Sequence, residues 1–210
     1  MRLTVFGATG RTGKELVEQA LAAGNEVVAY ARSPSKLGIT HEKLTIVQGE
    51  LSDRGMIERA IKRADAVISV LGPRRGSKGK PLTQGMQNIV AAMDTQAVRR
   101  MIISSTLSVK DQNDMPEFRA GALVFLVKHT MHAAYEEIVS VADTLLASDL
   151  DWTIVRLTMF DNNAKSGKVR AGYLGRGEVG TWIARADIAD FMLKQVLDRK
   201  YVRQAVAISN

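Results

Sequence analysis

The chain has 210 residues, of which 46% are hydrophobic, so it can bury one substantial core but has little room for a second full domain. We therefore expect a single domain covering residues 1–210. The sequence contains no cysteine, which excludes disulfides, zinc–thiolate sites and thiol catalysis. Its formal net charge is +7, but aromatic residues make up only 5% and none interrupts the basic cluster at 74–80. This pattern favours an anionic small molecule over nucleic acid as the partner of the positive charge.

No apolar stretch is long enough to cross a bilayer. The longest comprises residues 122–127, and the apolar run at the N-terminus ends after a few residues at a glycine. We therefore expect a cytoplasmic protein without a membrane partner.

The first two predicted elements are a strand and a helix joined by a glycine-rich turn. Residues Arg2–Phe6 are apolar and β-branched, as in a central parallel strand, and apolar residues recur at helical spacing over 16–21. The turn between them reads Gly-Ala-Thr-Gly-Arg-Thr-Gly over residues 7–13. Its Gly-x-x-Gly-x-x-Gly spacing departs from the commoner Gly-x-Gly-x-x-Gly fingerprint. A glycine turn at a helix N-terminus leaves backbone N–H groups free for an anion, which predicts a dinucleotide pyrophosphate site.

The second predicted strand, residues 26–30, is followed by Arg32, Ser33 and Lys36. Sites that prefer NAD place an acid here, which accepts hydrogen bonds from the adenosine ribose. A guanidinium can instead pair with a 2′-phosphate through its planar fork. Arg32 therefore favours NADP(H) over NAD(H), the alternative being a solvated charge at a strand end.

Strands and helices continue to alternate to the end of the chain. We expect further strands at 44–47, 65–71, 100–105, 152–156 and 205–208, and helices from a cap at 52–53 to 62, then at 83–94, 132–147 and 186–197. This order predicts an α/β protein with a single-domain Rossmann fold. Its sheet is doubly wound and mostly parallel, of about seven strands with helices on both faces. The ligand crevice should lie at the carboxyl ends of strands one, four and five.

Four segments resemble the atypical short-chain dehydrogenase/reductases, the group that includes NmrA-like proteins and the NADPH-dependent flavin reductase biliverdin reductase B. They are the glycine turn at 7–13, Arg32, residues 88–93 and residues 183–189, and the resemblance extends from residue 2 to about 197. It implies contacts to pyrophosphate at the glycine turn, to the 2′-phosphate after the second strand, to adenine after the third, and to the nicotinamide and its ribose after later strands. The implied cofactor residues are Gly7, Thr9, Gly10, Arg11, Thr12, Gly13, Arg32, Ser33, Lys36, Glu50, Leu51, Leu71, Gly72, Ser104, Ser105, Leu157 and Thr158.

The substrate pocket implied by the resemblance consists of Arg74, Thr106, Met159 and Phe160. Thr106 aligns with a serine near the substrate of the flavin reductase and is the candidate catalytic residue; an ordinary strand-end threonine is the alternative. Three scattered histidines lack the spacing of metal ligands, so we expect no metal site.

The dyad of ordinary short-chain dehydrogenases, Tyr-x-x-x-Lys, is missing. None of the four tyrosines is followed by lysine four residues later; Tyr135, for example, precedes Val139. We therefore expect an NADPH-dependent reductase that transfers hydride to a planar electron acceptor such as a flavin or quinone. An alternative is a non-catalytic, NmrA-like sensor that binds NADP(H) and a protein partner. A sugar-nucleotide epimerase is disfavoured because 210 residues leave little room for a substrate domain.

Some apolar and charged residues allow two interpretations each. Met115, Phe118 and the run at 122–127 could form an apolar wall over a planar acceptor, or belong to the core or a subunit interface. Arg156 could approach the crevice or form a buried ion pair. Asp187 is expected near the cap of the last long helix.

Overall fold

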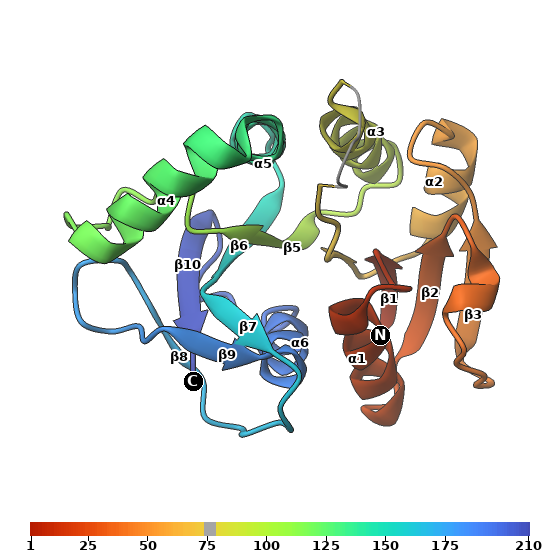
Figure 1. The fold of residues 1–210 in the computed structure, drawn as a ribbon. Helices are drawn as coiled ribbons and strands as arrows, with labels where there is room; N and C mark the ends of the chain where they lie inside the picture. The colour runs from red at the N-terminus through yellow and green to blue at the C-terminus, as the bar shows by residue number, and fades with distance from the viewer. Residues whose placement is uncertain (74–78) are drawn as a thin grey trace.

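The computed structural model describes residues 1–73 and 79–210, and its centre is an eight-stranded sheet (Figure 1). In spatial order the strands are β3 (Leu44–Gln48), β2 (Glu26–Ala31), β1 (Arg2–Phe6), β4 (Ala66–Ser69), β5 (Arg100–Thr106), β6 (Asp151–Leu157), β10 (Gln204–Ser209) and β8 (Arg170–Gly172). All neighbouring pairs are parallel except β10 and β8. The strand order reverses direction at β1, which is the switch point where α/β proteins bind their ligands.

Helices cover both faces of the sheet and divide the core in two. Helices α1 (Arg11–Ala22) and α6 (Arg185–Lys194) pack together on one face, and α2 (Arg54–Ile61), α3 (Pro81–Thr95) and α5 (His132–Leu146) cover the other. Side chains of β1 alternate between the two halves of the core. Leu3 and Val5 face α1 and α6, whereas Phe6 faces the helices on the opposite side of the sheet. The predicted fold class is confirmed: this is an α/β Rossmann fold with a mostly parallel sheet.

The structure contains more strands than the sequence predicted. Besides β8, a separate two-stranded sheet pairs β7 (Met159–Asp161) with β9 (Trp182–Ala184). Each of these strands has three residues, too few to produce a hydrophobic period. By contrast, β4 is only four residues long, so the expected strand over 65–71 was too long at both ends.

Helix α4 (Phe118–Thr130) was not predicted. Its apolar residues lie on all sides, so the sequence lacks the one-sided spacing of an ordinary surface helix. Phe125 and Leu126 are 63% and 57% exposed, so the interpretation of the apolar run at 122–127 as part of the core is wrong. Within the described residues, no helix combines the length and apolar character needed to span a membrane.

Asp187 lies near the N-terminal cap of α6, as expected, but does not form the capping bond itself. It is fully buried in the first turn of α6, but its carboxylate does not cap that helix. Instead it accepts hydrogen bonds from the backbone N–H groups of Ser166 and Gly167 at 2.9 and 2.8 Å, and from the side-chain amide of Asn210 at 2.9 Å. It thereby fastens the segment before β8 and the C-terminus to α6.

Candidate functional site

The turn after β1 has the geometry of a loop built for close backbone approach. Gly7 has φ +82°, and the N–H of Gly10 donates to the carbonyl oxygen of Gly7 at 3.0 Å. A Cβ at Gly13 would overlap that same carbonyl oxygen, so only glycine fits there. Gly10 is the N-cap of α1 and offers no side chain to the first N–H groups of the helix. These groups are the donors that a pyrophosphate would need.

The first of two clefts lies beside this turn, at the ends of β2, β3 and β4. Its volume is about 260 Å³, and five of the predicted cofactor residues line it: Arg32, Glu50, Leu51, Leu71 and Gly72. We call it the small cleft. It also receives Glu137 of α5 and the first residues of α3, which the sequence did not indicate.

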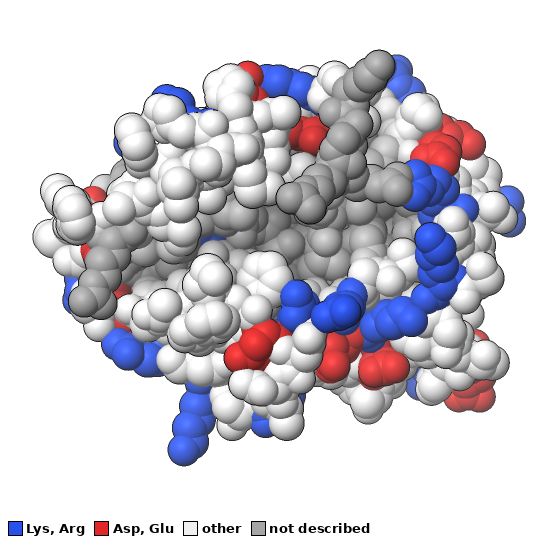
Figure 2. Space-filling view, in the orientation of Figure 1, with Lys and Arg blue, Asp and Glu red and all other residues white. Residues whose placement is uncertain are grey.

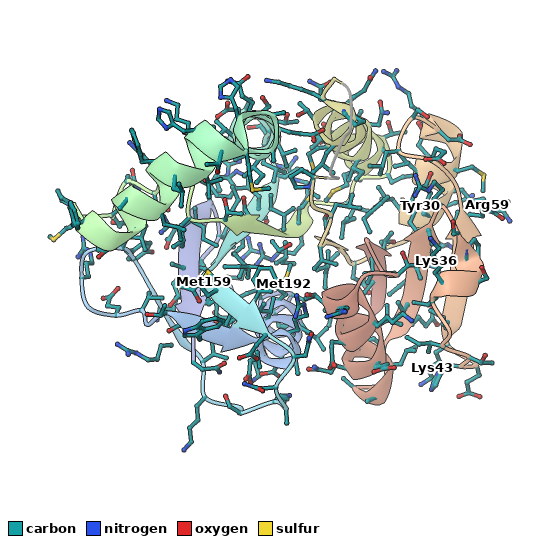
Figure 3. All side chains as sticks on the ribbon, viewed as in Figure 1. Tyr30, Lys36, Lys43, Arg59, Met159 and Met192 are labelled. Atoms are coloured by element: carbon teal, nitrogen blue, oxygen red, sulfur yellow. The ribbon has the colours of Figure 1, made fainter. Side chains whose placement is uncertain are left out.

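Arg32 and Glu50 face each other at the mouth of the small cleft. Arg32 Nε lies 3.9 Å from Glu50 Oε1, and both side chains are about half exposed. The hydroxyl of Tyr30 donates to the carbonyl of Glu50 at 2.7 Å. Burial, followed by the charges of Asp53 and Glu50, raises the pKa of Tyr30 to about 12, so this hydroxyl keeps its proton. Tyr30 and Lys36 lie on the same side of the molecule, across from Met159 (Figure 3).

The second cleft is larger, with a volume of about 610 Å³. It is formed by three segments: residues 107–123, the end of β6 with the start of β7, and the loop over 173–181. Two predicted residues, Thr158 and Met159, line it. We call it the large cleft. Figure 2 shows the molecule hollowed between the side that carries α4 and the side that carries β7, with basic side chains gathered along the rim over α1 and β2.

Its other lining residues are mainly apolar or glycine and come from α4, from the segment before it and from the loop over 173–181. They are Leu107, Pro116, Glu117, Phe118, Ala120, Leu123, Tyr173, Leu174, Gly175, Gly177, Val179, Gly180 and Thr181.

Other predicted residues lie outside both clefts. Thr106, at the end of β5, is half-buried, and its Oγ1 accepts a hydrogen bond from the N–H of Ser108 at 3.3 Å. Phe160 is stacked under the guanidinium of Arg185, whose Cζ lies 4.6 Å from the ring centroid. Ser33, Ser104, Ser105 and Leu157 are also not lining residues, and Arg74 lies outside the described residues.

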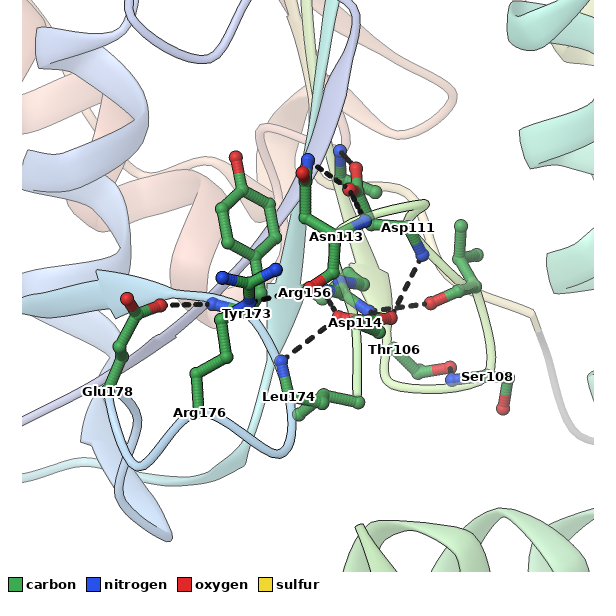
Figure 4. Close-up of polar contacts among 12 residues, drawn as sticks. Thr106, Ser108, Asp111, Asn113, Asp114, Arg156, Tyr173, Leu174, Arg176 and Glu178 are labelled. Atoms are coloured by element: carbon green, nitrogen blue, oxygen red, sulfur yellow. Dashed lines mark hydrogen bonds and ion pairs between the residues drawn. The ribbon is translucent and has the colours of Figure 1, made fainter. Parts of the chain in front are cut away.

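A buried ion pair ties two walls of the large cleft together (Figure 4). Arg156 is fully buried and binds both oxygens of Asp114, at 2.6 and 2.8 Å. The N–H of Leu174 donates to Asp114 at 3.0 Å, so the carboxylate holds the loop over 173–181 against the segment before α4. Burial alone would raise the pKa of Asp114, but the hydrogen bonds from Arg156 and from the backbone N–H groups of Asp111 and Leu174 lower it overall. Of the two interpretations of Arg156, the structure supports the ion pair.

No local pattern indicated Asp114 or the loop over 173–181, because their contacts join segments far apart in the chain. Tyr135 lines neither cleft; it is half-buried, with Lys128 Nζ 5.8 Å from its ring centroid. Among the described residues, no group of three or more His, Asp or Glu side chains could hold a metal ion.

Solved structures of known proteins match this chain over its whole length. The structure of ChuY, an anaerobilin reductase from Escherichia coli O157:H7, matches all of this chain and 97% of its own at a TM-score of 0.81 and 20% identity. A short-chain dehydrogenase/reductase from Veillonella parvula, solved in complex with NADP, matches 100% and 94% of the two chains at a TM-score of 0.77 and 20% identity. At such identities the likeness shows the fold alone.

Among curated sequences, 2-alkyl-3-oxoalkanoate reductase of Shewanella oneidensis is 30% identical over 58% of this chain and 34% of its own. The chain spans 34–37% of the length of the first curated relatives it matches. A family model described as NAD(P)H-binding matches residues 7–199. The chain therefore belongs to this NAD(P)H-binding family.

Proposed function

We propose that this protein is an NADPH-dependent reductase that transfers hydride to a planar acceptor such as a flavin or a quinone. The observation that carries the proposal is the large cleft, with apolar walls and a volume of about 610 Å³, at the same edge of the sheet as the glycine turn. Pockets of this size and character suit a small planar molecule.

The residues of the glycine turn fit a dinucleotide. The positive φ of Gly7 and the lack of space for a Cβ at Gly13 bring the backbone close to a bound phosphate, and the open N-terminus of α1 supplies donors. Arg32, at the mouth of the small cleft, would hold the 2′-phosphate. When bound, the cofactor supplies the hydride, so the protein needs only to orient the two rings and exclude water.

The side chains around the large cleft would orient the acceptor. Leu123 and Phe118 of α4 form one wall, Met159 another, and Tyr173 a third. The ring of Tyr173 is fixed because its hydroxyl bonds to the side chain of Gln204. An acceptor seated among them would be shielded from water on three sides.

Arg32→Ala tests the cofactor preference. Hydrogen bonds to charged groups are worth about 1.5–3 kcal/mol, so NADPH should bind about tenfold or more tightly than NADH to the original protein. The substitution should remove most of this difference and leave the NADH affinity nearly unchanged. Arg59→Ala, on the outer side of α2, is the matched control and should preserve the difference. Equal affinities of the original protein for NADH and NADPH would refute the role of Arg32.

Leu123→Trp tests the position of the acceptor. Overfilling a packed site typically costs 1–3 kcal/mol, so kcat/KM for FMN or menadione should fall about tenfold while the Kd for NADPH stays the same. Leu126→Trp, on the exposed side of the same helix, is the control. If the two variants behave alike, the acceptor does not bind in the large cleft. Tight NADPH binding without oxidation by any flavin or quinone would favour the sensor instead.

A further inference from the structure

Glu137 is a buried acidic residue that lines the small cleft. It lies in the second turn of α5 and is only 3% exposed. Its Oε1 accepts a hydrogen bond of 2.6 Å from the N–H of Leu82, in the first turn of α3. Among residues 1–73 and 79–210, no other side chain or backbone group forms a hydrogen bond or ion pair with this carboxylate. Glu137 is nevertheless a lining residue of the cleft, together with Leu71 and Gly72.

This arrangement leaves most of the hydrogen-bonding capacity of the carboxylate unused. Two carboxylate oxygens offer about four acceptor positions, and the N–H of Leu82 fills one of them. The N-terminus of α3 favours a negative charge here, but a buried carboxylate ordinarily requires several donors. Donors from a ligand in the small cleft would supply what the protein does not.

We propose that Glu137 is a positioning residue for the cofactor and that its carboxylate accepts hydrogen bonds from the hydroxyls of the nicotinamide ribose. The proposal rests on the dinucleotide binding assumed in the proposed function. Carboxylates are the usual partners of ribose hydroxyls in dinucleotide sites. In NADPH the 2′-hydroxyl of the adenosine ribose carries a phosphate, so the intact diol is on the nicotinamide ribose.

The placement of Glu137 agrees with this assignment. Arg32 and Glu50 are about half exposed, whereas Glu137 is buried and reaches the small cleft from α5, which packs beside β5. Glu137 is therefore the ionisable side chain that α5 directs toward the small cleft.

Glu137→Gln separates this role from a purely structural one. The glutamine keeps the length of the side chain and an oxygen for the N–H of Leu82, but removes the charge and one acceptor. The Kd for NADPH should rise about tenfold or more. The Kd for adenosine 2′,5′-bisphosphate, which lacks the nicotinamide ribose, should change less than twofold. The melting temperature without cofactor should be unchanged. Glu136→Gln, the exposed neighbour that pairs with Lys80, should leave all three values unchanged.

An unchanged Kd for NADPH in Glu137→Gln would overturn the proposal, and so would an equal loss of affinity for adenosine 2′,5′-bisphosphate. A lower melting temperature with the same ratio of the two Kd values would show that Glu137 serves only to hold α3. If the glutamine variant does not fold, the same two Kd values are measured for Glu137→Asp, which keeps the negative charge but moves it back by one methylene. This variant should raise the Kd for NADPH and leave that for adenosine 2′,5′-bisphosphate unchanged. None of these readings depends on an acceptor, so a failed acceptor screen would refute the reductase function and leave this test intact.

Discussion

Replacing Asp114 by asparagine should strongly destabilise the protein. Arg156 donates to both carboxylate oxygens at 2.6 and 2.8 Å from a position with no solvent access. Its remaining bond, 3.1 Å from Nη1 to the carbonyl of Val109, cannot neutralise the charge. Breaking a buried pair by removing one partner typically costs 3–5 kcal/mol, because the other charge stays buried without compensation.

For a chain of 210 residues, each kcal/mol corresponds to about 2–4 °C of melting temperature, so Asp114→Asn should melt about 6–20 °C lower than the original protein. The double variant Asp114→Asn/Arg156→Met removes both charges and should recover a large part of the loss. Urea unfolding followed by circular dichroism measures both effects. A loss below about 1 kcal/mol in the single variant would show that Arg156 is solvated or otherwise paired, and would refute the reasoning.

The same pair predicts a pH dependence. The pKa of Asp114 in the folded protein is below its ordinary value, because the bonds from Arg156 and backbone N–H groups outweigh the effect of burial. A depressed pKa gives stability that is complete above the unfolded value of about 4 and is lost as the pH falls through the folded value. The difference in unfolding free energy between the original protein and Asp114→Asn should therefore be constant near pH 7 and shrink below about pH 4.

Elements with a strong local signal could be predicted from the sequence. Two examples depend on neighbouring residues alone. One is the strand Arg2–Phe6 before the glycine turn, and the other is the Asp53 cap, whose Oδ1 accepts a hydrogen bond from the N–H of Met56 at 3.1 Å. The Rossmann fold follows from such elements because right-handed βαβ crossovers leave few topologies. Helix α4 could not be predicted, because its apolar residues show no preferred face.

Some residues of the candidate site could likewise be predicted from the sequence, and others could not. Residues that follow strand ends, such as Arg32 and Glu50, meet in the small cleft because parallel strands present their carboxyl ends at one edge. Glu137 and Tyr173 reach the clefts from a helix packed against another and from an irregular loop. Their positions depend on tertiary contacts across about fifty and thirty residues, to Leu82 and Gln204, which no local pattern encodes.

Two further substitutions test the cofactor site and the chemistry. Gly10→Val should abolish dinucleotide binding, because a branched side chain at this turn would occupy the space into which the pyrophosphate must come. The chain should still fold, because the new Cβ would lie 3.3 Å from the oxygen of Gly7 and meet no other atom within 4 Å. NADPH at about 100 times its Kd should stabilise the original protein by roughly 2.7 kcal/mol, or about 5–10 °C; an undiminished shift in the variant would place the phosphates elsewhere. Tyr135→Phe should reduce kcat with flavin or quinone less than about tenfold, because Val139 replaces the lysine that would activate this phenol, whereas losing a general acid costs 10²–10⁴. A loss in that larger range, with NADPH affinity and melting temperature unchanged, would identify Tyr135 as the proton donor and restore a tyrosine-dependent mechanism.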